Sequence, residues 1–187
     1  MSLTLLDYRR RVAAMYAAAR NDGDLAAFRD ARHELFTTHP DSPLEPGAAA
    51  PEYWPLRPDL RYEADVDTDV KPTPYVTDEA RFTRFGTLHL PIGDLDVFWL
   101  DGYGGGVFLP FKDATNGATT YGGGRYLLDT VKGADLGTTP TGALVVDFNF
   151  AYHPSCSYSP RWTCPLAPPG NALALPVEAG ERTATRQ

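Results

Sequence analysis

One stretch near the middle of the chain indicates the fold class: Asp94-Leu-Asp-Val-Phe-Trp-Leu-Asp-Gly-Tyr-Gly-Gly-Gly-Val-Phe108. Its first part alternates Leu95, Val97 and Trp99 with two aspartates and a phenylalanine, which predicts a strand with one apolar face. The run Asp101–Gly106 has the glycine content of a flexible hairpin turn, and apolar residues resume after it. We therefore expect antiparallel β structure in this part of the chain.

Short runs of the same kind occur on both sides of this stretch, and each is bounded by Gly, Pro, Asp or Asn. The expected strands are Arg61–Val66, Ala80–Leu90, Asp94–Trp99, Gly106–Pro110, Arg125–Leu128, Ala143–Phe148 and Leu173–Glu178. Many short strands separated by turn residues are typical of an antiparallel sheet wound into a barrel or sandwich.

Helical periodicity is confined to the start of the chain. Leu3–Arg20 and Leu25–Phe36 carry apolar residues at helical spacing, and Arg32 shares the second helix with apolar residues on related faces. The run Asn21-Asp22-Gly23-Asp24 ends the first helix and can cap the second, and the prolines Pro40 and Pro43 end the second helix. The predicted class is α+β, mainly β, with a helical hairpin before the β-barrel or sandwich.

Composition suggests four segments along the chain. They are a helical hairpin at residues 1–40, a proline-rich connector at 41–58, a β-rich domain at 59–182 and a disordered tail at 183–187. We expect Tyr53, Trp54 and Leu56 to hold the connector on the domain surface. Residues 1–3 have the composition of a cloning remnant.

The charge balance excludes some classes of partner. A formal net charge of -7 argues against DNA, RNA and anionic membranes. No stretch approaches the roughly 20 apolar residues needed to cross a bilayer. Arg9, Arg10 and Arg11 interrupt any apolar stretch of a signal peptide, so a cytoplasmic location is expected.

Five segments between Phe108 and Glu181 are distinctive. They are Phe111-Lys-Asp-Ala-Thr-Asn-Gly117, Tyr121-Gly-Gly-Gly-Arg-Tyr126, Asp147-Phe-Asn-Phe-Ala-Tyr152, Cys164-Pro-Leu-Ala-Pro-Pro-Gly-Asn171 and Glu178-Ala-Gly-Glu181. In this order they resemble the hallmarks of the bacterial and archaeal family called domain of unknown function 1684. His153 departs from the family pattern, which more often has Asn there. The resemblance implies a fold boundary and a site location, but no established reaction.

Candidate ligand-binding residues lie within these segments. Arg125, after three glycines, could bind a carboxylate or phosphate through two parallel hydrogen bonds. Asp147 and Asn149, two apart on an expected strand, would share a face and orient the ligand. The remaining predicted residues of this pocket are the walls Tyr121, Tyr126 and Tyr152, and Asp113.

A structural alternative stands beside each of these roles. Arg125 could pair with Asp113 or Asp147 and tie a loop to the sheet. Asp147 and Asn149 could instead satisfy backbone groups of the irregular loop Ala151–Pro169.

The preferred function from sequence is a small-ligand-binding β domain whose ligand is a small anion. One alternative is a divalent-metal-dependent hydrolase using Asp147, Glu178 and Glu181. Another is an interaction module in which the helical hairpin docks a partner or a second copy. No serine-hydrolase elbow, zinc-protease motif or P-loop indicates a reaction.

The two cysteines do not predict a cofactor. With His153, Cys156 and Cys164 could give three zinc ligands, but a fourth ligand and the short Cys-x-x-Cys spacing are missing. Two thiols are also too few to staple a secreted scaffold. No metal or cofactor is expected, and the two thiols are expected to be buried or loosely paired.

Overall fold

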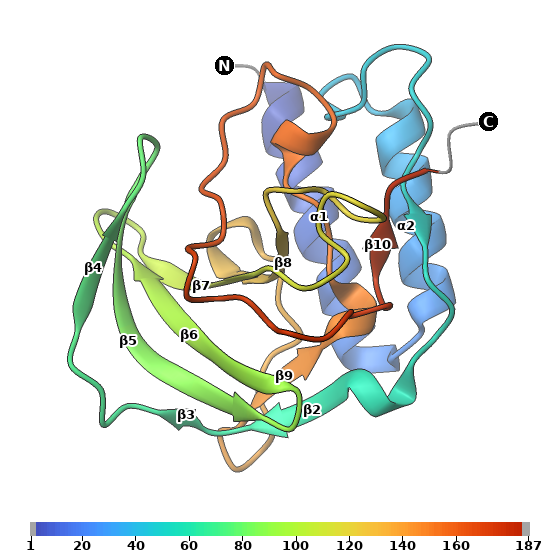
Figure 1. The fold of residues 1–187 in the computed structure, drawn as a ribbon. Helices are drawn as coiled ribbons and strands as arrows, with labels where there is room; N and C mark the ends of the chain where they lie inside the picture. The colour runs from blue at the N-terminus through green and yellow to red at the C-terminus, as the bar shows by residue number, and fades with distance from the viewer. Residues whose placement is uncertain (1–2, 185–187) are drawn as a thin grey trace.

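The computed structural model describes residues 3–184, which form two helices beside a curved antiparallel sheet (Figure 1). Helices α1 (Leu3–Asp22) and α2 (Leu25–Thr38) confirm the predicted hairpin, and each runs two residues beyond its predicted end. Asp24 caps α2 by accepting a hydrogen bond of 2.9 Å from the backbone N–H of Ala27.

The main sheet contains six strands among the described residues. They are β3 (Val66–Asp67), β4 (Thr73–Val76), β5 (Arg81–Leu90), β6 (Gly93–Leu100), β7 (Gly106–Phe111) and β8 (Arg125–Asp129). Their order is β3-β5-β6-β7-β8, and β4 also pairs with β5. This confirms a mainly β, α+β fold, but the hydrogen-bonded strands do not close into a barrel.

Two further strand pairs connect distant parts of the chain. Strand β2 (Arg61–Ala64) pairs with β9 (Leu144–Asp147), and β1 (Glu52–Tyr53) pairs with β10 (Glu181–Arg182). Residues 3–184 also contain four short 3-10 helices, which are η1 (Pro58–Leu60), η2 (Thr130–Lys132), η3 (Phe148–Phe150) and η4 (Ser155–Ser157).

Some predicted strands differ from the structure. Residues 173–178 form no strand, and Phe148 belongs to η3 rather than to β9. Within the expected connector, Tyr53 lies in β1, and the Trp54 N–H donates to the Gly180 carbonyl at 3.0 Å. Leu56, however, is 58% exposed.

The core occupies both faces of the sheet. Leu95 and Val97 of β6 are buried as predicted, but Trp99 is half-exposed. Phe98 instead joins Phe82 and other rings in an aromatic cluster on the opposite face. The expected alternation fails here because Tyr75 of β4 packs against Phe98 and covers that face as well.

The helical hairpin shares a core with the β-rich part. Tyr16 of α1 and Phe28 of α2 pack edge to face, and Phe28 packs in the same way on Phe150. The apolar face of the hairpin is therefore used within the chain. No helix among residues 3–184 is long and apolar enough to cross a membrane.

The division into segments stays a prediction. Of the expected tail, residues 185–187 lie outside the described residues, and Thr183 donates a backbone hydrogen bond of 2.9 Å to the Thr119 carbonyl. Residues 1–2 of the expected cloning remnant also lie outside the described part.

Candidate ligand-binding site

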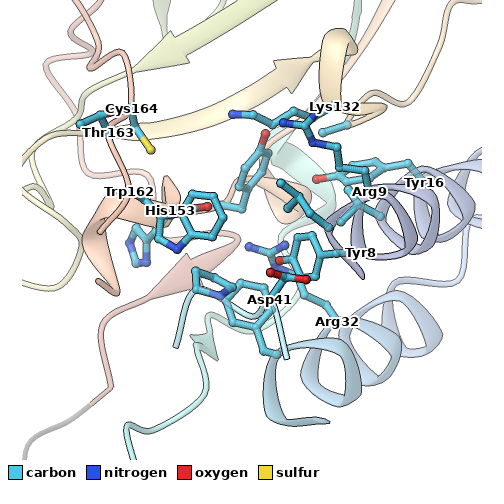
Figure 2. A pocket seen from close by; sticks show the side chains of 17 residues that line it. Tyr8, Arg9, Tyr16, Arg32, Asp41, Lys132, His153, Trp162, Thr163 and Cys164 are labelled. Atoms are coloured by element: carbon cyan, nitrogen blue, oxygen red, sulfur yellow. The ribbon is translucent and has the colours of Figure 1, made fainter. Parts of the chain in front are cut away.

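A cavity of about 210 Å³ lies between the helical hairpin and the loop that follows Tyr152 (Figure 2). The side chains around it come from α1, from α2 and the residues just after it, from η2 and the residues just after it, and from Tyr152 and this loop. Its lining residues are Leu5, Tyr8, Arg9, Val12, Tyr16, Arg32, Phe36, Asp41, Pro43, Lys132, Ala134, Tyr152, His153, Ser155, Trp162, Thr163 and Cys164.

The size of the cavity limits what it can hold. One water occupies about 30 Å³ of liquid, and pockets for drug-sized ligands span roughly 300–1,000 Å³. The cavity therefore suits a molecule smaller than a typical drug.

Arg32 is the buried cation of this cavity. Its side chain comes from α2, its Nε–H donates to the Oε1 atom of Glu181, and the residue is 4% exposed. The guanidinium carbon lies 4.4 Å from the ring centroid of Phe36 and 5.2 Å from that of Tyr152. Figure 2 shows the Arg32 side chain extending from α2 toward Tyr8. A guanidinium held between rings and a carboxylate has a fixed orientation.

Glu181 carries a full negative charge behind Arg32. Burial is the largest single influence and would raise the pKa of the Glu181 carboxyl, but the charge of Arg32, the interaction with His153 and the hydrogen bonds from both residues together hold this pKa below its ordinary value. Its Oε2 atom accepts hydrogen bonds from the His153 backbone N–H at 2.7 Å and the Tyr158 hydroxyl at 2.8 Å. The carboxylate therefore positions Arg32 and the start of the loop together.

His153 is neutral at physiological pH. Burial lowers the pKa of His153 to about 4. Its Nε2 accepts a hydrogen bond of 3.2 Å from the Tyr121 backbone N–H, which assigns the proton to Nδ1. Nδ1 lies 3.5 Å from the Tyr158 hydroxyl oxygen and 3.8 Å from Glu181 Oε2.

Three residues that line the cavity each contain a buried polar atom with no hydrogen-bond partner within residues 3–184. These atoms are the Tyr16 hydroxyl oxygen, Nε1 of Trp162 and Oδ2 of Asp41. Tyr16 is 1% exposed, so its hydroxyl is held away from solvent. A buried polar atom without a partner is costly, and a ligand that pairs with it recovers that cost.

Two further cations line the cavity. Lys132 Nζ lies 2.9 Å from a carboxylate oxygen of Asp129, and Arg9 is an exposed residue of α1. The lining therefore contains three cationic side chains, counting Arg32, and one carboxylate, that of Asp41.

The structure places the sequence-predicted anchor, Arg125, elsewhere. Arg125 is fully buried, and its NH2 group donates to the Asp113 carboxylate at 2.8 Å and the Val177 carbonyl at 2.7 Å. Its NH1 group donates to the carbonyls of Ala179 and Glu181. The pairing with Asp113, which is the structural alternative from sequence, is therefore present, and Arg125 ties residues 177–181 to β8.

Asp147 and Asn149 lie at a different cavity, beside Leu56 and Arg61. They do not share a strand face as expected, because β9 ends at Asp147 and Asn149 lies in η3. The Asn149 amide accepts from the Arg57 N–H and donates to the Arg57 carbonyl, both at 2.8 Å. These two bonds join η3 to the connector. The Asn149 side chain therefore pairs with the backbone of Arg57 and not, as the structural alternative expected, with the backbone of the loop Ala151–Pro169.

The three predicted tyrosine walls also separate. Tyr152 lines the 210 Å³ cavity, while Tyr121 lines a smaller one on the far side of His153. The Tyr126 hydroxyl donates to the Pro165 carbonyl. The seven predicted residues thus do not line one cavity, and Tyr152 alone belongs to the one centred on Arg32.

Sequence reasoning did not select Arg32, although its place among the apolar residues of α2 was a usable signal. A charged residue on the buried face of a helix requires a partner. Tyr16 and Trp162 carried no comparable signal, because aromatic residues are ordinary in a core.

The three carboxylates of the hydrolase alternative also lie apart. Asp147 accepts from Asn149, Glu181 pairs with Arg32, and Glu178 is exposed. Within the described part of the chain, no group of three His, Cys, Asp or Glu residues is arranged to hold a metal ion.

No curated protein matches the chain. The chain is similar to the solution NMR structure of an uncharacterized protein from Haloarcula marismortui, with 32% identity and a TM-score of 0.59. That match covers 89% of this chain and 96% of the other. A family model described as protein of unknown function (DUF1684) matches residues 50–182, which include β10 and the loop around the cavity. The chain therefore belongs to the DUF1684 family.

Proposed function

We propose that this protein binds a small amphipathic acid in the cavity between the helical hairpin and the loop after Tyr152. The observation that carries the proposal is the buried guanidinium of Arg32 at the wall of an otherwise largely apolar and aromatic cavity. The proposal keeps the small anionic ligand expected from sequence and moves its anchor from Arg125 to Arg32.

The chemistry of Arg32 favours a carboxylate as the charged group. A guanidinium has five N–H donors, and its hydrogen bond to Glu181 uses the one at Nε. Because Glu181 fixes the plane of the group, a carboxylate can meet the remaining donors in a bidentate geometry at little cost in side-chain entropy. Arg9 and Lys132 add positive charge to the lining.

The remaining lining favours an apolar body with one polar substituent. Tyr8, Val12 and Phe36 offer rings and methyl groups to the body. Asp41 Oδ2 needs a hydrogen-bond donor, and Trp162 Nε1 needs an acceptor. A hydroxy acid or amino acid with an apolar side chain meets these demands together.

The test compares four compounds that share a phenyl ring: 3-phenyllactate, phenylalanine, phenylacetate and the neutral 2-phenylethanol. Calorimetric titration of the full chain should show that 3-phenyllactate and phenylalanine bind best. The neutral 2-phenylethanol should bind at least about tenfold more weakly than phenylacetate. Equal affinity for 2-phenylethanol and phenylacetate would refute a role for the charge.

A cavity-filling variant separates this cavity from the rest of the surface. Val12→Phe adds a ring to the lining without touching the Arg32–Glu181 pair, so binding of 3-phenyllactate should be lost while the chain stays folded. Arg61→Ala alters the cavity beside Asp147 and serves as the matched control, with affinity unchanged. If Val12→Phe binds 3-phenyllactate as well as wild type, or if Arg61→Ala loses binding, the ligand does not bind in the proposed cavity.

A further inference from the structure

We propose that Cys164 and Cys156 form a thiol–disulfide exchange site in the cavity wall, which takes small organic disulfides as its substrate class. Cys164 is the attacking thiol, and Cys156 is the thiol that resolves the mixed disulfide. This inference uses a pair of side chains that the binding of an acid does not require.

The two cysteines contact each other although seven residues separate them. The backbone N–H of Cys156 donates to Sγ of Cys164 at 3.4 Å, and both cysteines are free thiols. Cys156 lies in η4, and Cys164 lies in a stretch without regular secondary structure just before Pro165. Sγ of Cys156 also lies 3.9 Å from the Tyr121 hydroxyl oxygen.

Cys164 is the member of the pair that the cavity exposes to a small molecule. It is 8% exposed overall, yet it lines the cavity beside Trp162 and Thr163 (Figure 2). Cys156 does not line this cavity. Cys156 is the more exposed residue of the two, but a reagent bound in the cavity contacts Cys164 first.

The surroundings of Cys164 favour its thiolate. The hydrogen bond from the Cys156 thiol lowers the pKa of Cys164 to about 6, with further help from the Cys156 backbone N–H and the charge of Lys132. The same hydrogen bond raises the pKa of Cys156, so this thiol keeps its proton. A thiolate with a pKa near ambient pH is an effective nucleophile toward disulfides.

The exchange balances in two steps. The Cys164 thiolate attacks one sulfur of the small disulfide, the S–S bond of the reagent breaks, and the first thiolate that leaves can take the proton of Cys156. The Cys156 thiolate then attacks Sγ of Cys164, and the second small thiolate leaves. The protein dithiol is oxidised to a disulfide, and the small disulfide is reduced to two thiols.

The reagent for the test is dithiodiglycolate, a small disulfide with two carboxylates. Incubated with the full chain near neutral pH, it should oxidise the two cysteines to a disulfide. Intact-mass measurement should then show a protein that has lost two hydrogen atoms. Cys156→Ser should accumulate a stable mixed disulfide on Cys164, because no resolving thiol remains. Cys164→Ser should gain no adduct on the same timescale, and circular dichroism verifies that both variants are folded.

Peptide mapping of wild type, quenched with acid at early times, tests the order of attack without any substitution. The proposal requires the first adduct on Cys164 and a rate that falls as pH drops below about 6. A first adduct on Cys156, a Cys164→Ser variant that reacts as fast as wild type, or reaction only after unfolding would overturn it.

Discussion

Arg32 in α2 and Glu181 in β10, 149 positions apart in the chain, form an ion pair that is shielded from solvent. The pair joins the helical hairpin to the last described strand, and Arg32 lines the cavity. The other carboxylate oxygen holds the His153 N–H and the Tyr158 hydroxyl. A single contact thus connects fold stability with the shape of the candidate site.

Glu181→Gln should destabilise the protein by about 3 kcal/mol, because it leaves the buried charge of Arg32 without its counter-charge. The measurement is the free energy of unfolding in urea at neutral pH. Asp59→Asn, in a solvent-exposed pair with Arg57, is the control and should leave the free energy of unfolding almost unchanged.

The double variant Arg32→Met/Glu181→Leu distinguishes the charge from the packing. Removing both charges together should cost less than Glu181→Gln alone, since no unpaired ion stays buried. A double variant less stable than Glu181→Gln would show that the pair supplies net stability.

His153→Gln should reduce the dependence of stability on pH between about 4 and 6.5. The folded-state pKa of His153 is lowered, so the unfolded state binds more protons in this window and wild-type stability falls as pH drops. A shift from 6.5 to about 4 corresponds to roughly 3 kcal/mol. Gln can still accept the hydrogen bond from the Tyr121 N–H, so the two proteins should be similar near pH 7.

Chemical unfolding at pH 7, 6 and 5 checks this difference. Glu181 also contributes stability that is lost at low pH. Because the pKa of its carboxyl is lowered in the folded state, this loss begins only near the ordinary pKa of a glutamate and continues below it, and it is the same in both proteins. Parallel curves for wild type and His153→Gln would show that His153 does not titrate as a buried neutral group.

The helices and most central strands could be predicted because their signals are local. Periodicity and a capping residue locate α1 and α2, and glycine-rich turns bound β6 and β7. The two-residue strands β1 and β10 carry no such pattern, since their pairing depends on chain segments brought together by the rest of the fold.

The candidate site was harder to predict than the fold. The distinctive segments indicated polar residues of the interior, and many of these bind backbone groups of the chain itself. Arg125 and Asn149 are examples, because both side chains form hydrogen bonds with backbone carbonyls of the chain. The cavity instead depends on how α1 and α2 dock against the loop, which a single sequence does not encode locally.

Arg125→Met should be more damaging than loss of an ordinary hydrogen bond. It removes the hydrogen bonds to the carbonyls at residues 177, 179 and 181 and leaves Asp113 buried without a cation. A loss of about 3–5 kcal/mol is expected. Thermal and urea unfolding measure it, and Arg84→Met, in the part-exposed pair with Asp96, is the control with a smaller loss.

Gly180→Ala should be destabilising for a backbone reason. Gly180 has φ of 73°, and an added Cβ would lie 2.5 Å from the Ala151 carbonyl oxygen and 2.7 Å from that of Phe148. The clash could be relieved only by moving η3 or the residues next to Glu181. Gly142 also has a positive φ, but a Cβ added there would have no neighbour within 4 Å. Gly142→Ala therefore measures the conformational cost without the clash. Equal losses of unfolding free energy in the two variants would argue against the clash.

Asn171→Asp tests the end of the Cys164–Asn171 segment, because one amide there joins β6 and β7. The Asn171 amide accepts from the Asp96 N–H at 2.9 Å and donates to the carbonyls of Asp96 and Pro110, each at 2.8 Å. A carboxylate keeps the acceptor, loses both donations and sets a buried negative charge against two carbonyl oxygens. We expect a loss of about 3 kcal/mol in urea unfolding at pH 7, smaller at low pH where the carboxyl can protonate. Asn21→Asp, at an exposed position, is the matched control and should change stability by about 0.5 kcal/mol or less. A loss for Asn171→Asp no larger than this control would show that the amide does not hold the strands together.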